Sequence, residues 1–176
     1  LERHLQQIEK LGWDKLQFEG VKISEYAPPQ KPDVVLALHA CNTATDDALF
    51  QAITWESKMV FASPCCHHNL QVQLEKQQEN LTVFAPLFRY GVLSERLGDI
   101  ITDSFRALIL RIMGYQTDVI EFVSTDHTNR NLIIRAIKCL EPGDQKFVEE
   151  YKALKVVWHV TPYLEELLGE RLTQYL

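Results

Sequence analysis

Cysteine and histidine side chains follow two apolar segments of this sequence. The first segment ends in Leu38-His39-Ala40-Cys41-Asn42, and the second ends in Ser63-Pro64-Cys65-Cys66-His67-His68. Thiolates and imidazoles can act as nucleophiles, bases or metal ligands. A single cysteine is more often a small buried filler than a reactive group. Two such clusters in one chain nevertheless favour a functional site.

Three chemistries are compatible with these clusters. The residue types suit zinc, but adjacent residues seldom face one ion and the sequence has no C-x₂-C or H-x₃-H spacing, so we predict no bound metal. A nucleophilic Cys65 or Cys66 would need a base such as His39 to form its thiolate. The third possibility is a pocket for a cofactor and a substrate group, with histidine as base or orienter.

The apolar segments are expected to be neighbouring strands. Residues 34–38 and 58–63 are short apolar runs bounded by turn signals, as in strands buried on both faces. A helix from residue 43 to about residue 55 would join them, and that connection implies parallel pairing. Parallel strands lie about 4.8 Å apart and open α/β sheets bind ligands beyond their carboxyl ends. We therefore expect His39 and Cys41 to face the same cavity as Cys65 and Cys66.

The remaining elements complete an α/β fold. Apolar spacing predicts a long helix over Leu93–Met113, stopped by Gly114. The arginines of this region, Arg106 among them, are expected on a solvated face, and Asp46 and Asp47 are expected as helix-start charges. Further elements are a strand over Phe18–Ile23, a hairpin of residues 118–124 and 131–139, and helices over 145–154 and 162–172. Pro142-Gly143 separates a domain of residues 1–140 from a C-terminal helical extension of residues 141–176.

Composition and charge exclude several classes. The 176 residues are 46% hydrophobic and 24% charged, which excludes a disordered chain, and no run of 18 apolar residues could span a membrane. The net charge of −6 argues against binding of naked nucleic acid through overall charge, although a local basic groove could still bind it. Four cysteines without a disulfide framework indicate reduced thiols and a cytoplasmic location.

Three segments carry a family resemblance: PDVVLALHACNTATDDALFQAI, SPCCHHNL and GYQTDVIEFVSTDHTNRNLIIRAIK. They resemble a family of class I S-adenosylmethionine-dependent methyltransferases with the motifs ALHAC…TATDDA and SPCCHH. The glutathione-S-transferase-C-terminal-domain-containing protein and the methyltransferase-like proteins are relatives. The Cys-Cys-His-His string is also similar to one in a tRNA ribose methyltransferase family. The resemblance covers about residues 21–138.

This resemblance implies a Rossmann-like sheet of order 3-2-1-4-5-7-6 with the last strand antiparallel. Residues 18–23 would form its third strand, residues 33–41 the fourth, residues 58–66 the fifth and the hairpin the sixth and seventh. S-adenosylmethionine would be the cofactor, and RNA or a small molecule would accept the methyl group. The implied catalytic residues are His39, Cys41, Asn42, Cys65, Cys66 and His67, and the implied cofactor contacts are Val21, Lys22, Leu38, His39 and Ala40.

The sequence departs from the family in one respect. The family's glycine-rich cofactor turn and the acidic residue that holds the ribose are absent, and the seven glycines include no G-x-G. The chain therefore resembles the C-terminal two-thirds of such a domain, without its first two strands, and is expected to be inactive alone. The strand over Val34–Leu38 would then be an exposed edge. We expect it either to pair with Phe18–Ile23 or to associate with another chain.

Two other functions remain open. One is a non-catalytic interaction module with a methyltransferase-like fold. The other is a protein with a zinc site or a thiol redox site at the cysteine clusters.

Overall fold

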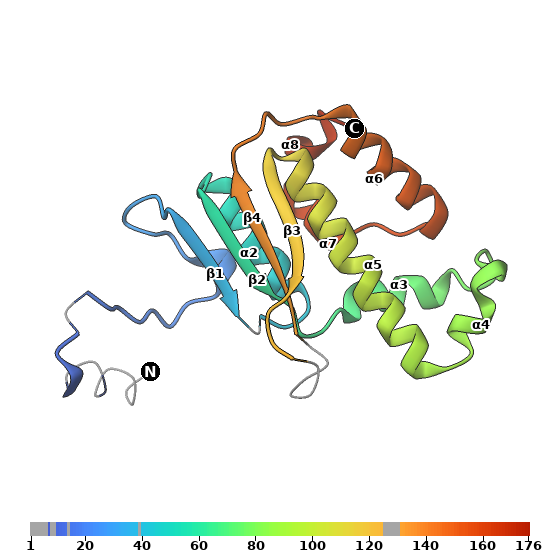
Figure 1. Cartoon of the computed structure of the whole chain (residues 1–176), viewed down its shortest axis with the longest axis horizontal. Helices are drawn as coiled ribbons and strands as arrows, with labels where there is room; N and C mark the ends of the chain where they lie inside the picture. The colour runs from blue at the N-terminus through green and yellow to red at the C-terminus, as the bar shows by residue number, and fades with distance from the viewer. Residues whose placement is uncertain (1–6, 8–9, 14, 39, 125–130) are drawn as a thin grey trace.

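The computed structural model describes residue 7 and residues 10–13, 15–38, 40–124 and 131–176. A four-stranded sheet of order β1-β2-β4-β3 forms its centre (Figure 1). Strand β1 (Val34–Leu38) runs parallel to β2 (Met59–Ser63), whereas β4 (Leu132–Lys138) is antiparallel to both β2 and β3 (Tyr115–Glu121). The prediction of an α/β fold is confirmed. The strand order is also the one that the resemblance implies for the family's fourth to seventh strands.

Helices connect the strands and follow the last one. The predicted helices after residues 42 and 92 are confirmed as α2 (Thr43–Thr54) and α5 (Gly91–Ile112). The other elements are η1 (Ile23–Glu25), α3 (His68–Lys76), η2 (Thr82–Phe84), α4 (Ala85–Phe88), α6 (Gln145–Trp158), α7 (Tyr163–Leu168) and α8 (Glu170–Thr173). The helix predicted over residues 162–172 is interrupted at Gly169, which has a φ of 51°. None of the described helices has the length and apolarity needed to cross a membrane.

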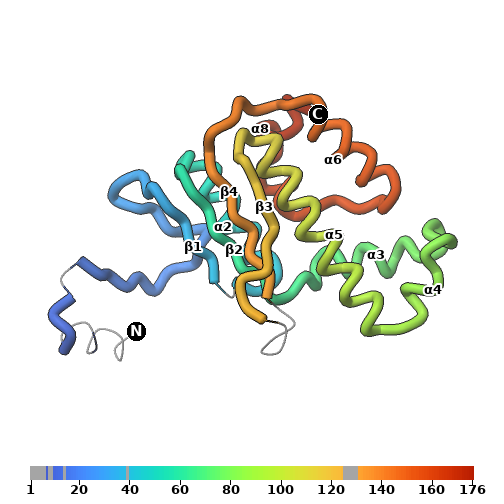
Figure 2. Tube along the Cα trace, viewed as in Figure 1, coloured from blue at the N-terminus to red at the C-terminus, as the bar shows by residue number. Residues whose placement is uncertain are grey.

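One face of the sheet forms the core with the helices. Small and branched side chains of the central strands are completely buried there: Val60, Ala62, Ile134 and Ala136. Side chains alternate between the faces of a strand, so these residues share the face on which α2 and α5 pack. Phe105 of α5 is fully buried, and its ring meets the ring of Tyr151 of α6 edge to face, with 5.5 Å between centroids. Helices α6 to α8 therefore belong to the same core, and the tube in Figure 2 shows α6 beside α5.

Strand β1 lies at the edge of the sheet. It pairs with β2 along one side, and no described strand pairs along its other side. On the face away from α2 its side chains are open to solvent, with Leu36 64% and Leu38 58% exposed. An unpaired apolar edge of this kind is a template for pairing with another chain.

The prediction of a strand over Phe18–Ile23 is wrong. Residues 16–22 form no regular element, and Ile23 begins the short helix η1. This segment lies against the C-terminal half of α2, where the Gln51 side chain donates a hydrogen bond to the carbonyl of Ser24. A strand is stable only when a neighbour satisfies its backbone N–H and C=O groups. The expected pairing with β1 is accordingly not formed.

Two further predictions concern the hairpin. Strand β3 begins at Tyr115, three residues earlier than predicted, because Gly114 ends α5 and the chain enters the sheet at once. Residues 125–130 of the link, which include His127, lie outside the described residues.

We expect the substitution Phe105→Ala to lower the free energy of unfolding by about 3–5 kcal/mol, because it removes a fully buried aromatic ring. Urea denaturation followed by circular dichroism measures this change. The matched control is Ile100→Ala on the same helix. The Ile100 side chain is 60% exposed, so its truncation should change the free energy of unfolding by no more than about 0.5 kcal/mol. Equal losses in the two variants would show that the face of α5 is assigned wrongly.

We also expect Leu36→Lys to reduce self-association, because a charge at the β1 edge opposes pairing between copies. Sedimentation velocity over a range of concentrations measures the association. Val156→Lys, at a 70% exposed position on α6 away from the sheet, is the control. A wild-type chain that stays monomeric at every concentration would contradict self-association through this edge.

Candidate functional site

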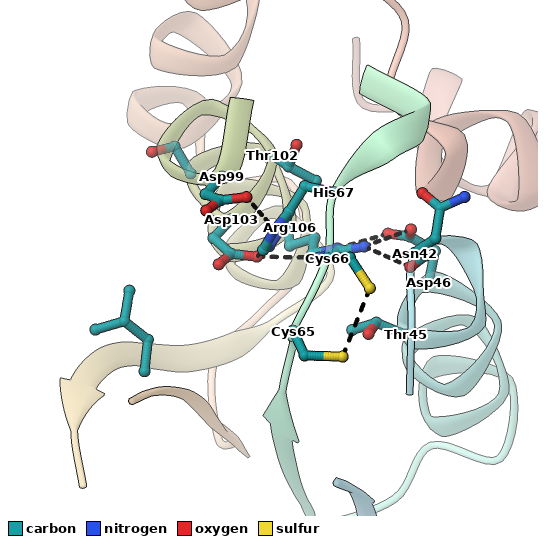
Figure 3. A network of polar contacts seen from close by, with 12 residues as sticks. Asn42, Thr45, Asp46, Cys65, Cys66, His67, Asp99, Thr102, Asp103 and Arg106 are labelled. Carbon is teal, nitrogen blue, oxygen red and sulfur yellow. Dashed lines mark hydrogen bonds and ion pairs between the residues drawn. The ribbon is translucent and has the colours of Figure 1, made fainter. Parts of the chain in front are cut away.

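The loops that follow β1 and β2 meet at one edge of the sheet. Leu38 is in register with Ser63, so the chain leaves both strands side by side. The backbone N–H of Asn42 donates to the carbonyl of Cys66 at 3.1 Å, and the backbone N–H of Asn69 donates to Asn42 Oδ1 at 2.9 Å. These two bonds fasten one loop to the other and hold Asn42 between them (Figure 3).

Asn42 has an unusual backbone conformation. Its φ of 53° and ψ of −123° lie in a region that glycine adopts readily and other residues avoid. Such a conformation costs about 1–3 kcal/mol and persists only where the surroundings impose it. Here Arg106 Nη2 donates to the carbonyl oxygen of Asn42 at 3.1 Å, in addition to the two bonds between the loops.

Arg106 is the buried centre of the polar network around these loops. Its side chain is 2% exposed, and it binds Asp46 through Nε at 2.8 Å and Nη2 at 2.7 Å. Nη1 donates to Asp103 Oδ1 at 3.0 Å. Burial disfavours the charge, but the hydrogen bonds and charges of Asp46 and Asp103 outweigh it and raise the pKa of Arg106. The ion pair therefore joins α2, which carries Asp46, to α5 (Figure 3).

His67 extends this network from the loop after β2. Its side chain is 3% exposed, with Nε2 3.0 Å from Asp103 and Nδ1 2.7 Å from Asp99. The contact of Nδ1 with Asp99 is an ion pair when the imidazole is protonated. Burial opposes protonation, yet the contacts with Asp103 and Asp99 raise the pKa of His67. Although the resemblance implies a catalytic His67, a buried imidazole between two carboxylates favours a role in holding the loops in place.

These groups enclose almost no free space. The cavity beside Asn42, Asp46, His67 and Arg106 measures about 10 Å³. A single water needs roughly 10–15 Å³, so a substrate does not fit inside. Any chemistry at this edge must therefore take place on the outer side of the loops, where Cys41 is exposed.

Three thiols gather on that outer side. Cys41 Sγ lies 3.0 Å from Cys65 Sγ, Cys65 Sγ lies 3.7 Å from Cys66 Sγ, and all three sulfur atoms are within 4.8 Å of one another. Hydrogen bonds from Cys65 and Cys66 lower the pKa of Cys41, whereas the contact with Cys41 and burial raise the pKa of Cys65 to about 12. Cys41 is therefore more readily deprotonated than Cys65. These distances agree with the expectation that Cys41 lies at the same edge of the sheet as Cys65 and Cys66. The shared cavity stays a prediction, and His39 lies outside the described residues.

The implied cofactor contacts fall in two places. Leu38 and Ala40 lie at the site edge, where the Thr45 hydroxyl donates to the carbonyl of Ala40. Val21 instead lines a hollow of about 260 Å³ beside Trp55, which follows the other end of α2, and Lys22 adjoins it. A helix of 12 residues is about 18 Å long, so the structure does not bring these two pairs together.

The sequence analysis missed the role of Arg106. It placed this arginine on a solvated face, whereas Arg106 is buried and forms an ion pair with Asp46. The expectation of Asp46 as a helix-start charge is confirmed, because Asp46 lies in the first turn of α2. The signal was the position of Arg106 three residues after Asp103 and next to the fully buried Phe105. An acid and an arginine on the apolar side of a helix are expected to pair inside the protein.

Comparison with known protein families gives a match over the N-terminal part of the chain. A family described as a methyltransferase domain matches residues 1–73, which include β1, α2, β2 and both loops. No curated protein and no solved structure matches the chain significantly. The family match and the mixed α/β sheet together support a methyltransferase-like domain.

We expect Arg106→Ala to lower the free energy of unfolding by about 3–5 kcal/mol, because Asp46 and Asp103 would stay buried without their counter-charge. Urea denaturation measures the loss. Arg135→Ala is the control, since its pair with Asp118 is 43% and 37% exposed and should contribute at most about 1 kcal/mol. Similar losses in both variants would contradict a central role for Arg106.

Proposed function

We propose that this domain transfers a methyl group from S-adenosylmethionine to an acceptor that is an RNA or a small molecule. The observation that carries the proposal is Asn42, a polar residue held in a strained conformation at the carboxyl edge of the sheet. It lies within the segment that matches a methyltransferase domain. Strained residues of this kind concentrate at active sites.

The reaction requires an acceptor that is fixed in position. When bound, S-adenosylmethionine supplies an electrophilic methyl group on a sulfonium. Orienting a nucleophile in line with that group removes much of the barrier. The amide of Asn42 can donate to and accept from a heteroatom of the acceptor, and its backbone is held by Arg106, Cys66 and Asn69. Arg106 and His67 are positioning residues in this proposal, because they act on the acceptor only through the loops that they hold in place.

The chain fits one end of the cofactor. Beside Asn42 the edge offers the small Ala40 and the exposed, apolar Leu38, which suit a methyl group and the carbon atoms around the sulfonium. Val21 and Lys22 lie near the opposite end of α2 and do not reach this place. The residues therefore fit the sulfonium end of S-adenosylmethionine and not its nucleoside end. In our proposal these residues form the acceptor side of the site.

The test combines binding with methyl transfer. The protein tested is extended at its N-terminus to include a glycine-rich cofactor turn, because the described residues fit only the sulfonium end of the cofactor. Calorimetric titration with S-adenosylhomocysteine measures cofactor binding, and transfer from S-adenosylmethionine with a tritiated methyl group is assayed with cellular RNA and with a small-molecule extract. We expect Asn42→Gly to lower the transfer rate about a hundredfold while binding is kept, because glycine relieves the strain and removes the orienting amide. Asn80→Gly, at an exposed turn, is the control and should transfer at the wild-type rate.

Two results would overturn the proposal. The first is equal transfer rates in Asn42→Gly and Asn80→Gly. The second is absence of both binding and transfer in the wild-type protein, which would favour a non-catalytic interaction module with the same fold.

A further inference from the structure

We propose that Cys41, Cys65 and Cys66 bind one zinc ion. Their sulfur atoms come from two loops and lie within 4.8 Å of one another. Thiolates are preferred ligands of zinc, and three protein ligands with an exchangeable fourth position are typical of zinc sites that do chemistry. This inference does not depend on methyl transfer.

The sulfur separations are close to those of a zinc site. Two thiolates bound to tetrahedral zinc at about 2.3 Å lie about 3.8 Å apart. Cys65 and Cys66 are already at 3.7 Å. The pair Cys41 and Cys65 must widen from 3.0 Å to about 3.8 Å, which a small side-chain rotation of the exposed Cys41 allows.

The backbone explains how adjacent cysteines converge. The sequence analysis expected no metal because adjacent residues seldom face one ion and the C-x₂-C and H-x₃-H spacings are absent. Within a strand, adjacent residues do point to opposite faces. Strand β2 ends at Ser63, and residues 64–67 have no regular structure. The strand alternation therefore no longer applies to Cys65 and Cys66.

The surroundings favour thiolates at this place. Asn42 is the N-cap of α2, which has 12 residues, and His67 is the N-cap of α3, which has 9. Cys41 and Cys66 directly precede these caps. The N-terminus of a helix carries a partial positive charge that stabilises a nearby thiolate. Three thiolates would in turn neutralise the charge of the cation, and the exposure of Cys41 leaves the fourth position open to water or a solute.

The first measurement is metal stoichiometry. The reduced, metal-free protein is titrated with zinc and examined by native mass spectrometry, and cobalt(II) serves as an optical probe of thiolate ligation. We expect one zinc per chain and thiolate-to-cobalt charge-transfer absorption. Cys41→Ser, Cys65→Ser and Cys66→Ser should each weaken zinc binding by more than the roughly 10–100-fold that follows loss of a supporting group around a metal site.

The fourth cysteine supplies the matched control. Cys139 follows β4 at the end of the sheet where β2 begins, away from the loops after β1 and β2. Its thiol contacts Gln116 there. Cys139→Ser should bind zinc as the wild type does. Alkylation gives a second measure that does not depend on any variant: zinc should protect Cys41, Cys65 and Cys66 from iodoacetamide and leave Cys139 reactive.

Three results would overturn this inference. The first is wild-type zinc affinity in Cys41→Ser, Cys65→Ser or Cys66→Ser. The second is alkylation of all four cysteines at rates that zinc does not change. The third is a reduced protein that binds no zinc, but in which an added oxidant links Cys41 and Cys65 by a disulfide.

Discussion

The buried ion pair of Arg106 with Asp46 and Asp103 is the interaction on which the candidate site depends. It joins α2 to α5, and Nη2 of Arg106 also donates to the carbonyl of Asn42. A guanidinium at this depth is stable only with its counter-charges, and the carboxylates depend on it equally. The strained backbone of Asn42 is therefore maintained by an interaction that lies beneath it, in the core.

The parallel pairing of β1 and β2 is the second constraint. Because Leu38 is in register with Ser63, the two loops leave the sheet together and can be bonded to each other. The same register brings Cys41 to the thiols that follow β2. Asn42 and the three cysteines are thus neighbours for one topological reason, although the methyl-transfer and zinc proposals assign them different chemistry.

Among the described strands, β1 has an unpaired edge and a solvent-exposed face, unlike the central strands of the sheet. Its edge has no described partner strand and its apolar side chains remain exposed, whereas the face toward α2 and α5 is closed. The segment before it packs on α2 near Trp55, about one helix length from Asn42. In our proposal the described residues form the acceptor side of the site, while Val21 and Lys22, which the resemblance implies as cofactor contacts, lie apart from it.

The sequence by itself determined the elements and the edge at which the clusters meet. Apolar periodicity is a local property, so it predicted four elements: β1, β2, α2 and α5. A helical connection between two neighbouring strands in turn dictates that they pair in parallel. Tertiary structure alone decided the rest. Arg106 pairs in the core with Asp46, which lies 60 residues earlier in the chain, and no local pattern identifies that partner. Cys65 and Cys66 converge because their strand ends before them, and residues 18–23 form no strand because their backbone groups have no neighbour to bond.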